Sequence, residues 1–258
     1  MNTSSHLYTF PLLTPYEPRL VCAISNRQLG NMSFAHAGQR VGEQVEVMNN
    51  RLGFARAAGF PLENTIVLRC AYGTDLMEVT EADRAKGVYC LETALSGEIL
   101  TTEETNLFLV IMVADCLAIA VIDPVKQCLA IAHAGYREVD NGVPSLAVKA
   151  MVQRYNSHPG DLLVVASPCL SRESNLMATM EFATHPDWHR FSRQTEAGWN
   201  VDFRGLAQSQ VAKEGVPPSQ IQFSRIDTFG SPNCFSHRES QLGGRPNGRM
   251  AMVVGFHP

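Results

Sequence analysis

The clearest pattern in the chain is a long apolar run that two polar interruptions divide into three segments. Residues 107–113, 117–122 and 128–135 are almost entirely apolar, as buried strands are. Asp115 and Cys116 separate the first two segments. The sequence DPVKQ separates the last two, with Pro124 at a position that favours a turn. The pattern predicts a strand, a sharp break, and then a hairpin of two strands.

The rest of the chain mixes strand and helix patterns. Residues 41–60 have helical periodicity that ends at Gly59, and one face of this helix would carry Val41, Val45, Met48, Leu52 and Ala55. We expect helices at 145–155, where Ser145 would be the cap, and at 201–216. We expect strands near residues 20–25, 65–73, 75–80, 161–169, 221–229 and 249–256. Strands follow one another without intervening helices, so the pattern predicts an α/β or α+β sandwich.

Composition narrows the class of protein. A chain of 258 residues can bury a substantial core, and no repeat or long linker divides it, so we expect one domain over residues 1–258. Lys and Arg number 21 against 25 Asp and Glu, which disfavours a nucleic-acid partner. The apolar run is short for a membrane span, and no signal peptide is evident. Seven cysteines without a CxxC pair indicate a reduced, cytoplasmic protein.

The predicted hairpin brings a thiol, an imidazole and a guanidinium to one edge of a sheet. Cys116 and His133 lie about equally far from the turn, so pairing the strands places them close together. Gly135 allows the chain to turn sharply, and Arg137 follows on the same loop. Cysteine and histidine are suitable zinc ligands, and a thiol beside an imidazole also suits nucleophilic catalysis. A buried thiol and a core histidine would explain each residue alone, but with Asp115 nearby the combination favours a functional site.

Several segments match, in order, the motifs of one known family. ADCLAIAVID and AIAHAGYRE are similar to its ADCLP and HAGWRG motifs, and SPC at 167–169 is similar to its Gly-Pro-Cys turn. FAHAGQRVGEQVEVMNNRL, VDFRGLA and CFSHRESQLGGRPNGRMAMVVGF match further motifs. The chain thus resembles the YfiH-like family, also called the laccase-domain or multicopper polyphenol oxidase family. The resemblance covers most of the chain and implies an αββα sandwich.

The resemblance also implies a metal site and an activity. It implies zinc held by two histidines and a cysteine, of which Cys116 and His133 would be two ligands. It implies a purine nucleoside phosphorylase that acts on adenosine or inosine with phosphate, with adenosine deamination as a side activity. The older family name implies copper. Oxidation by oxygen needs several coppers, and the eight histidines are scattered singly, so we expect zinc and no copper.

Basic residues near the matched motifs are candidates for binding the substrate. By the resemblance Arg137 would face phosphate, with Arg238 in the sequence SHRE as a second candidate. Arg249, in the glycine-rich segment before the last strand, is expected to approach the same site. His36 lies in a matching segment and is a further candidate for substrate or phosphate binding, though it is not favoured as a metal ligand.

One matched motif departs from the family pattern. Where the family has its first metal histidine, this chain reads CAYG, and Tyr72 occupies that place. A phenol, with a pKa of about 10, is a poorer zinc ligand than an imidazole, so Tyr72 is a candidate catalytic residue as a stacking surface or phenol donor. Cys70 shares a strand face with Tyr72 but lies roughly 6.6 Å away along an extended chain. It is therefore not expected to replace the histidine unless the backbone shifts.

Three hypotheses for the function follow. The first is a phosphorylase of purine nucleosides. The second is a member that has lost catalysis and binds a ligand or partner, which Tyr72 supports, as does Glu138 by placing an acid beside Arg137. The third is a metal-free hydrolase with Cys116 as nucleophile and His133 as base.

Overall fold

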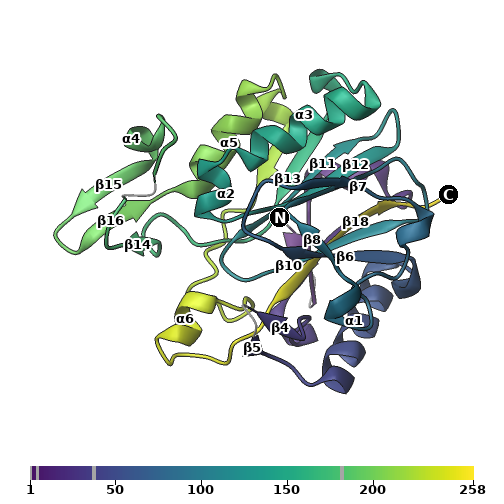
Figure 1. The fold of residues 1–258 in the computed structure, drawn as a ribbon, viewed down its shortest axis with the longest axis horizontal. Coiled ribbons are helices and arrows are strands. Elements are labelled where there is room, and N and C mark those ends of the chain that lie inside the picture. The colour runs from purple at the N-terminus through teal and green to yellow at the C-terminus, as the bar shows by residue number, and fades with distance from the viewer. Residues whose placement is uncertain (1, 4–5, 37–38, 181–182) are drawn as a thin grey trace.

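Two stacked β-sheets form the centre of the computed structural model, which describes residues 2–3, 6–36, 39–180 and 183–258 (Figure 1). The side chains of residues 2, 3, 36, 39 and 40 are also outside the description. In the described part of the chain, the first sheet has seven strands in the order β1 (Asn2–Thr3), β2 (Leu7–Thr9), β3 (Leu20–Ser25), β18 (Met250–Phe256), β10 (Phe108–Val113), β6 (Thr65–Cys70) and β8 (Leu95–Gly97).

The second sheet contains the predicted hairpin. Its described strands run in the order β17 (Ile221–Phe223), β13 (Leu163–Ala166), β11 (Leu117–Asp123), β12 (Cys128–Ala134), β9 (Ile99–Thr102) and β7 (Leu76–Glu78). A small sheet of β14 (Leu176–Met177), β16 (Gly198–Val201) and β15 (Ser192–Thr195) projects from the body together with the short helix α4 (Trp188–Phe191) (Figure 1). We call residues 172–180 and 183–202 the arm. The strands β4 (Ala35–His36) and β5 (Gln39–Arg40) pair separately.

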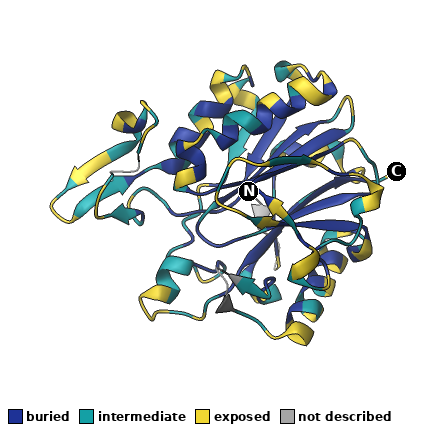
Figure 2. Ribbon diagram, viewed as in Figure 1, coloured by how far each residue is buried: buried dark blue, intermediate teal, exposed yellow. Residues whose placement is uncertain are grey.

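Helices cover the outer face of each central sheet. The helix α1 (Gln44–Ala58) packs on the first sheet. The second sheet is covered by α2 (Tyr136–Asp140), α3 (Val143–Tyr155) and α5 (Phe203–Lys213), while α6 (His237–Gln241) lies near the arm. A separate apolar cluster fills the space between the sheets, so the four layers are those of the predicted αββα sandwich. The central strands are the most buried part of the molecule (Figure 2). Within the described residues, no helix has both the length and the apolar character of a membrane span.

Two of the connections between the two central sheets lie next to each other. Glu98 lies between β8 of the first sheet and β9 of the second. Residues 114–116 connect β10 of the first sheet with β11 of the second. The hairpin of β11 and β12 has the predicted register, with Ala118 opposite His133. These two connections and the end of the hairpin bring residues of both sheets together at one place.

The helix α1 ends at Gly59 as predicted, in a left-handed conformation with φ of 78°, but its predicted buried face was wrong. Val45 is 74% exposed and Leu52 is 40% exposed, whereas Arg51 is buried. Arg51 stacks on Phe34 and donates hydrogen bonds to three backbone carbonyls, which compensates for the burial of its charge. Tertiary contacts therefore turn the helix to a different face from the one that apolar periodicity indicates.

Other element boundaries also differ from the predicted ones. Ser145 does not cap α3, because the helix begins earlier, after Gly142, with Pro144 in its first turn. The strands predicted at 161–169 and 221–229 are observed only as β13 and β17. The strand predicted near 20–25 is observed with those ends as β3, and the other predicted strands and the helix at 201–216 are present with shorter or shifted ends. The strands β1, β2, β4, β5, β8 and β9 and the arm were not predicted.

The core between the sheets gives a stability prediction. Ile131 is fully buried on β12 between the sheets, and Val125, in the turn of the same hairpin, is 74% exposed. We expect Ile131→Ala to lower the free energy of unfolding by about 2–5 kcal/mol, through lost burial and the cavity left behind. Val125→Ala should change it by less than about 0.5 kcal/mol. Urea denaturation of both variants checks this, and equal effects would contradict the assigned faces of the hairpin.

Candidate functional site

Asp115 holds the connection that presents Cys116. Its backbone has a φ of 79°, a left-handed conformation that is uncommon outside glycine. One carboxylate oxygen accepts a hydrogen bond from the Thr228 hydroxyl at 2.6 Å, and the other accepts one from the backbone N–H of Arg238 at 2.7 Å. Asp115 thus ties the connection between the sheets to the start of α6. Its polar interruption of the apolar run is explained by these two contacts.

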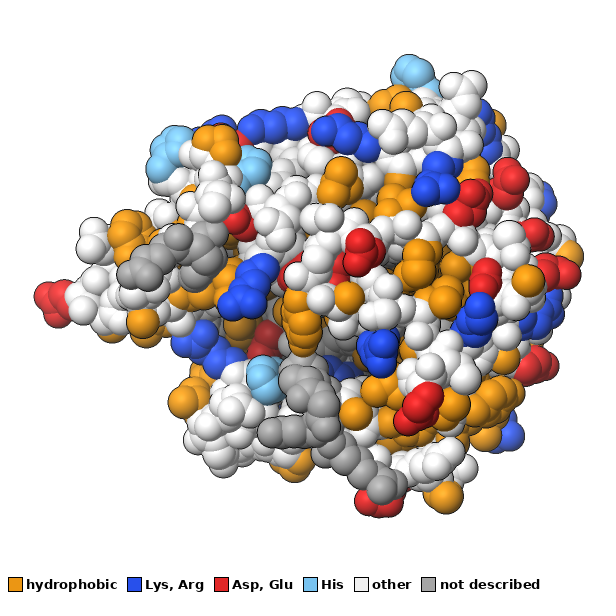
Figure 3. Space-filling model, viewed as in Figure 1, with side chains coloured by type: hydrophobic (Ala, Val, Ile, Leu, Met, Phe, Trp, Pro, Cys, Tyr) orange, Lys and Arg blue, Asp and Glu red, His pale blue; other side chains and the backbone are white. Residues whose placement is uncertain are grey.

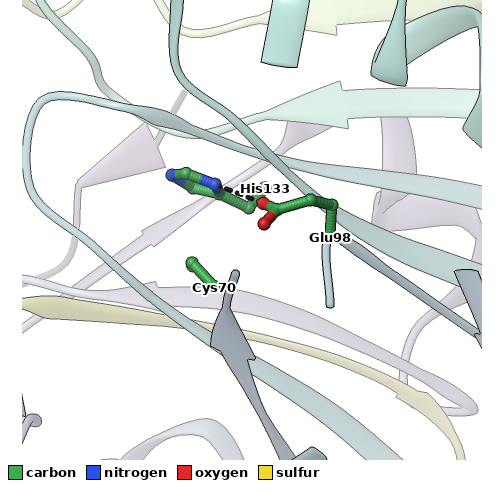
Figure 4. Close-up of side chains that lie close together, drawn as sticks. All are labelled: Cys70, Glu98 and His133. Carbon is green, nitrogen blue, oxygen red and sulfur yellow. Dashed lines mark hydrogen bonds and ion pairs between the residues drawn. The ribbon is translucent and has the colours of Figure 1, made fainter. Parts of the chain in front are cut away.

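The ring of His133 is held by a buried carboxylate that the sequence analysis did not single out. Glu98 is fully buried, and its Oε2 lies 2.7 Å from Nδ1 of His133. Its Oε1 accepts hydrogen bonds from the backbone N–H groups of Ala71 and Gly73. Figure 4 shows one ring nitrogen of His133 directed at Glu98 and the other directed away from it. Glu98 therefore fixes the orientation of the ring and leaves Nε2 available.

Two sulfur atoms lie beside the same histidine. The thiols of Cys116 and Cys70 both act electrostatically on the imidazole of His133. Burial by itself lowers the pKa of His133, but the two cysteines outweigh it and hold that pKa well above the ordinary histidine value. The predicted pairing of Cys116 with His133 is thus present in the structure, and a second thiol joins it.

The position of Cys70 corrects the expectation that it would lie too far from the site. The estimate assumed an extended strand through Tyr72, but β6 ends at Cys70 and Tyr72 has a left-handed backbone with φ of 62°. The chain therefore bends between the two residues. Ligand atoms of Cys70, Glu98 and His133 all lie within 4.8 Å of one another, and these residues could hold a metal ion together.

Glu138 and Gly135 close the other side of His133. Glu138 is buried, whereas Arg137, beside which the sequence placed it, is exposed. Its Oε2 accepts the backbone N–H of Gly135 and lies 3.9 Å from Nδ1 of His133. Burial raises the pKa of Glu138, and the nearby His133 lowers it in part. A Cβ atom on Gly135 would lie 3.0 Å from the sulfur of Cys116, so only glycine leaves that thiol its space.

A cavity of about 590 Å³ opens in front of Cys116. This is within the size range of small-molecule sites in proteins. Part of its wall is apolar and comes from the arm, and part is basic and comes from α6 and the start of β18. In Figure 3, basic side chains and a histidine gather where the arm meets the segment that carries α6. The lining includes Tyr72, Cys116, Tyr136, Leu170, Leu176, Met177, His237, Arg238 and Arg249.

The structure brings two of the three candidate arginines to this cavity. Arg238 lines it and donates from Nη2 to the backbone carbonyl of Leu176 in the arm. Arg249 is only 4% exposed, and its Nη1 donates to Asn247 and Gly248. Its Nη2 has no hydrogen-bond partner among the described residues.

The remaining two candidates cannot be assigned to the cavity wall. Arg137 is exposed, is not part of the described lining, and donates from Nε to the hydroxyl of Tyr136. The side chain of His36 lies outside the described residues, so its role in substrate or phosphate binding stays a prediction.

Tyr72 forms the boundary between this cavity and a second one. It lines both, and the second cavity, of about 250 Å³, is also lined by Cys70 and Arg249. The ring of Tyr72 meets that of His133 edge-on, with 6.2 Å between the centroids. Partial burial raises the pKa of the phenol, which disfavours the phenolate that a metal ligand would require. The ring therefore acts as a wall of the cavity.

Sequence reasoning missed Glu98, although a signal for it was present. Like Asp115, it is an acidic residue at the break between two strands, in the sequence LSGEILTT. A buried carboxylate requires partners, and this position could have been recognised on that ground. The arm residues that line the cavity had no comparable signal, because their sequence has no strong periodicity.

The role of Glu98 in holding this network together can be tested by measuring the stability of a variant. Glu98→Ala would leave the N–H groups of Ala71 and Gly73 and the ring of His133 without their acceptor. We expect the free energy of unfolding to fall by about 3 kcal/mol or more. Glu92→Ala, on an exposed residue nearby, should change it by less than about 0.5 kcal/mol. Urea denaturation measures both, and a small effect at Glu98 would argue against this network.

The close contacts around Gly135 predict that alanine substitutions at two glycines change the stability of the protein in opposite directions. Gly135→Ala should destabilise the protein by about 1–3 kcal/mol, because the new Cβ would contact Cys116 and Glu138. Gly53→Ala, inside α1 with only Leu29 at 3.8 Å, should stabilise it by about 0.5–1 kcal/mol. Thermal unfolding checks the two signs, and stabilisation at both positions would refute the close approach to Cys116.

Comparison with known proteins identifies the family to which this chain is similar. The family model described as multi-copper polyphenol oxidoreductase laccase matches residues 22–257. A relative named purine nucleoside phosphorylase YlmD, from Geobacillus stearothermophilus, is 28% identical over 88% of this chain and 85% of its own. A protein of the same name from Bacillus subtilis is 26% identical over 83% of this chain and 78% of its own.

The fold has a close match among solved structures. The crystal structure of YlmD from Geobacillus stearothermophilus superposes with a TM-score of 0.86 at 24% identity, covering 100% of this chain and 98% of that one. The family resemblance drawn from the ADC and HAG motifs is thereby confirmed. The family match spans the segments that contribute Cys70, Glu98, Cys116 and His133 to the site. The chain belongs to the multi-copper polyphenol oxidoreductase laccase family.

Proposed function

We propose that this protein is a purine nucleoside phosphorylase that transfers the ribose of adenosine or inosine to phosphate, with zinc at the site of Cys116 and His133. The names of the relatives support this reaction class. In this reaction an oxygen of phosphate forms a bond to C1′ of the ribose. The bond from C1′ to the purine breaks, and its electron pair leaves with the base.

The observation that carries the proposal is the buried guanidinium of Arg249. Its Nη2 is without a hydrogen-bond partner among the described residues, and the side chain lines the cavity in front of Cys116. A buried cationic donor without a partner is costly, and a bound anion would remove that cost. Burial also lowers the pKa of Arg249, an effect that a bound phosphate would oppose. Arg238 on the same wall offers a second cationic contact.

The rest of the cavity suits a nucleoside. Leu170, Leu176 and Met177 give an apolar surface, and the rings of Tyr72 and Tyr136 can stack on a purine. The arginines and the aromatic wall would hold phosphate and nucleoside together, which lowers the entropic barrier to their reaction. Zinc would supply a Lewis acid that polarises the substrate when bound. Glu98 keeps the ring of His133 oriented throughout.

The test is base release from adenosine and from inosine by the purified protein, followed with and without phosphate. We expect phosphate-dependent release by the wild type and none by Cys116→Ala, which controls for a contaminating phosphorylase. Adenosine deamination would appear in the same assay as inosine formed without phosphate. If a folded wild-type protein releases no base, the proposal fails, and the hypothesis of a binding protein that has lost catalysis replaces it.

The role of Arg249 gives a sharper prediction. Arg249→Met should raise the KM for phosphate by about 10-fold or more, because a charge-assisted hydrogen bond contributes about 1.5–3 kcal/mol. Arg56→Met, on the exposed face of α1, is the matched control and should leave the KM unchanged. Steady-state kinetics at varied phosphate measures both. An unchanged KM in the Arg249 variant would remove this residue from the phosphate site.

A further inference from the structure

The donors around His133 differ from those that the family resemblance implies. Cys70 comes from the end of β6 in the first sheet, Cys116 from the connection between β10 and β11, and His133 from β12 in the second sheet. Ligand atoms of Cys70 and His133 lie within 4.8 Å of each other, and the hairpin register places Cys116 at the same end of β12 as His133. We propose that Cys70 is the third protein ligand of the metal, so that the site consists of two thiolates and one imidazole.

Glu98 belongs to the same cluster but acts as a positioning residue. Its Oε1 already accepts two backbone N–H groups, and its Oε2 faces Nδ1 of His133 at 2.7 Å. It is fully buried, and it leaves Nε2 as the free nitrogen of the ring. Metal-ligating histidines commonly use their second nitrogen for such a carboxylate contact, which orients the ring and makes it a better ligand.

Position 72 does not supply the third donor. Tyr72 is 51% exposed, and its ring meets that of His133 edge-on with 6.2 Å between the centroids, so its hydroxyl is not directed at the nitrogen of His133. The bend at Tyr72 is also what leaves Cys70 beside His133. Cys70 therefore offers, beside His133, the donor atom that Tyr72 does not.

The proposed donor set has a definite chemical character. Two cysteines and a histidine with one open position are a known arrangement for catalytic zinc. Two thiolates neutralise the charge of a divalent ion, whereas one thiolate with two histidines leaves one positive charge. Sulfur donors also favour zinc over hard ions such as magnesium. A zinc ion at this site would thus carry no net charge with its ligands.

The experiment counts thiolate ligands without relying on turnover. Zinc is measured by elemental analysis of protein purified under reducing conditions, and is then exchanged for cobalt, whose thiolate bonds give a charge-transfer absorption. We expect one metal per chain, with the absorption reduced by about half in Cys70→Ser and in Cys116→Ser. Metal affinity in both should fall by at least the ~10–100-fold typical for loss of an outer hydrogen-bond partner.

Three further variants separate ligands from neighbours. Cys90→Ser, at a half-exposed cysteine outside the cluster, and Tyr72→Phe should leave absorption and stoichiometry unchanged. Glu98→Gln should keep the full thiolate absorption while weakening metal affinity ~10–100-fold, as a positioning role requires. If a cysteine variant does not fold, alkylation of the wild type provides the test, since bound zinc should protect Cys70 and Cys116 together.

The results that test this metal site differ from the results that test the proposed function. The assignment of Cys70 as a ligand rests on the proposed function only for the role of the metal in catalysis. Full absorption and stoichiometry in Cys70→Ser would overturn the assignment, as would a metal-free wild type with Cys70 joined to Cys116 in a disulfide. Metal bound by two thiolates without base release would sustain the assignment and refute the phosphorylase. Base release by a Cys70→Ser protein that retains its metal would do the reverse.

Discussion

The buried carboxylate of Glu98 is the interaction on which the arrangement of the site depends. It lies where the chain leaves one central sheet and enters the other, fully shielded from water. A charge in that position must be compensated by partners, and its partners are two backbone N–H groups after β6 and the ring of His133. The same contacts that satisfy the charge join the two sheets and fix the orientation of the imidazole.

A second acidic residue, Asp115, holds the neighbouring connection between the sheets in place. Asp115 adopts a left-handed backbone and uses both carboxylate oxygens on Thr228 and on the start of α6. Together the two carboxylates fix the end of β6, the turn before β11 and the first residues of α6. Cys70, Cys116 and the basic cavity wall belong to these segments, so their relative positions follow from backbone constraints rather than from contacts among the functional side chains.

Much of the fold and of the candidate site could be predicted from the sequence, and the predictions that were wrong have physical causes. The hairpin that pairs Cys116 with His133 was predictable because apolar runs and a proline turn fix its register. The face of α1 was not, because the burial of Arg51 depends on carbonyls and a phenyl ring far away in the sequence. Cys70 was misplaced because a single left-handed residue, Tyr72, invalidates any distance estimated along an extended strand.

The arm has a consequence for how such a protein can change over evolutionary time. Leu176 and Met177, which form part of the cavity wall, lie on a small sheet outside the central sandwich, whereas Cys70, Cys116 and His133 lie between its two sheets. Asp140 anchors the arm through Thr184, His185 and Trp188, at a distance in the sequence from those wall residues. Mutations in the wall can therefore change the shape of the cavity while the cluster between the sheets is inherited intact. The cavity wall and the Cys/His cluster of this fold can thus diverge independently.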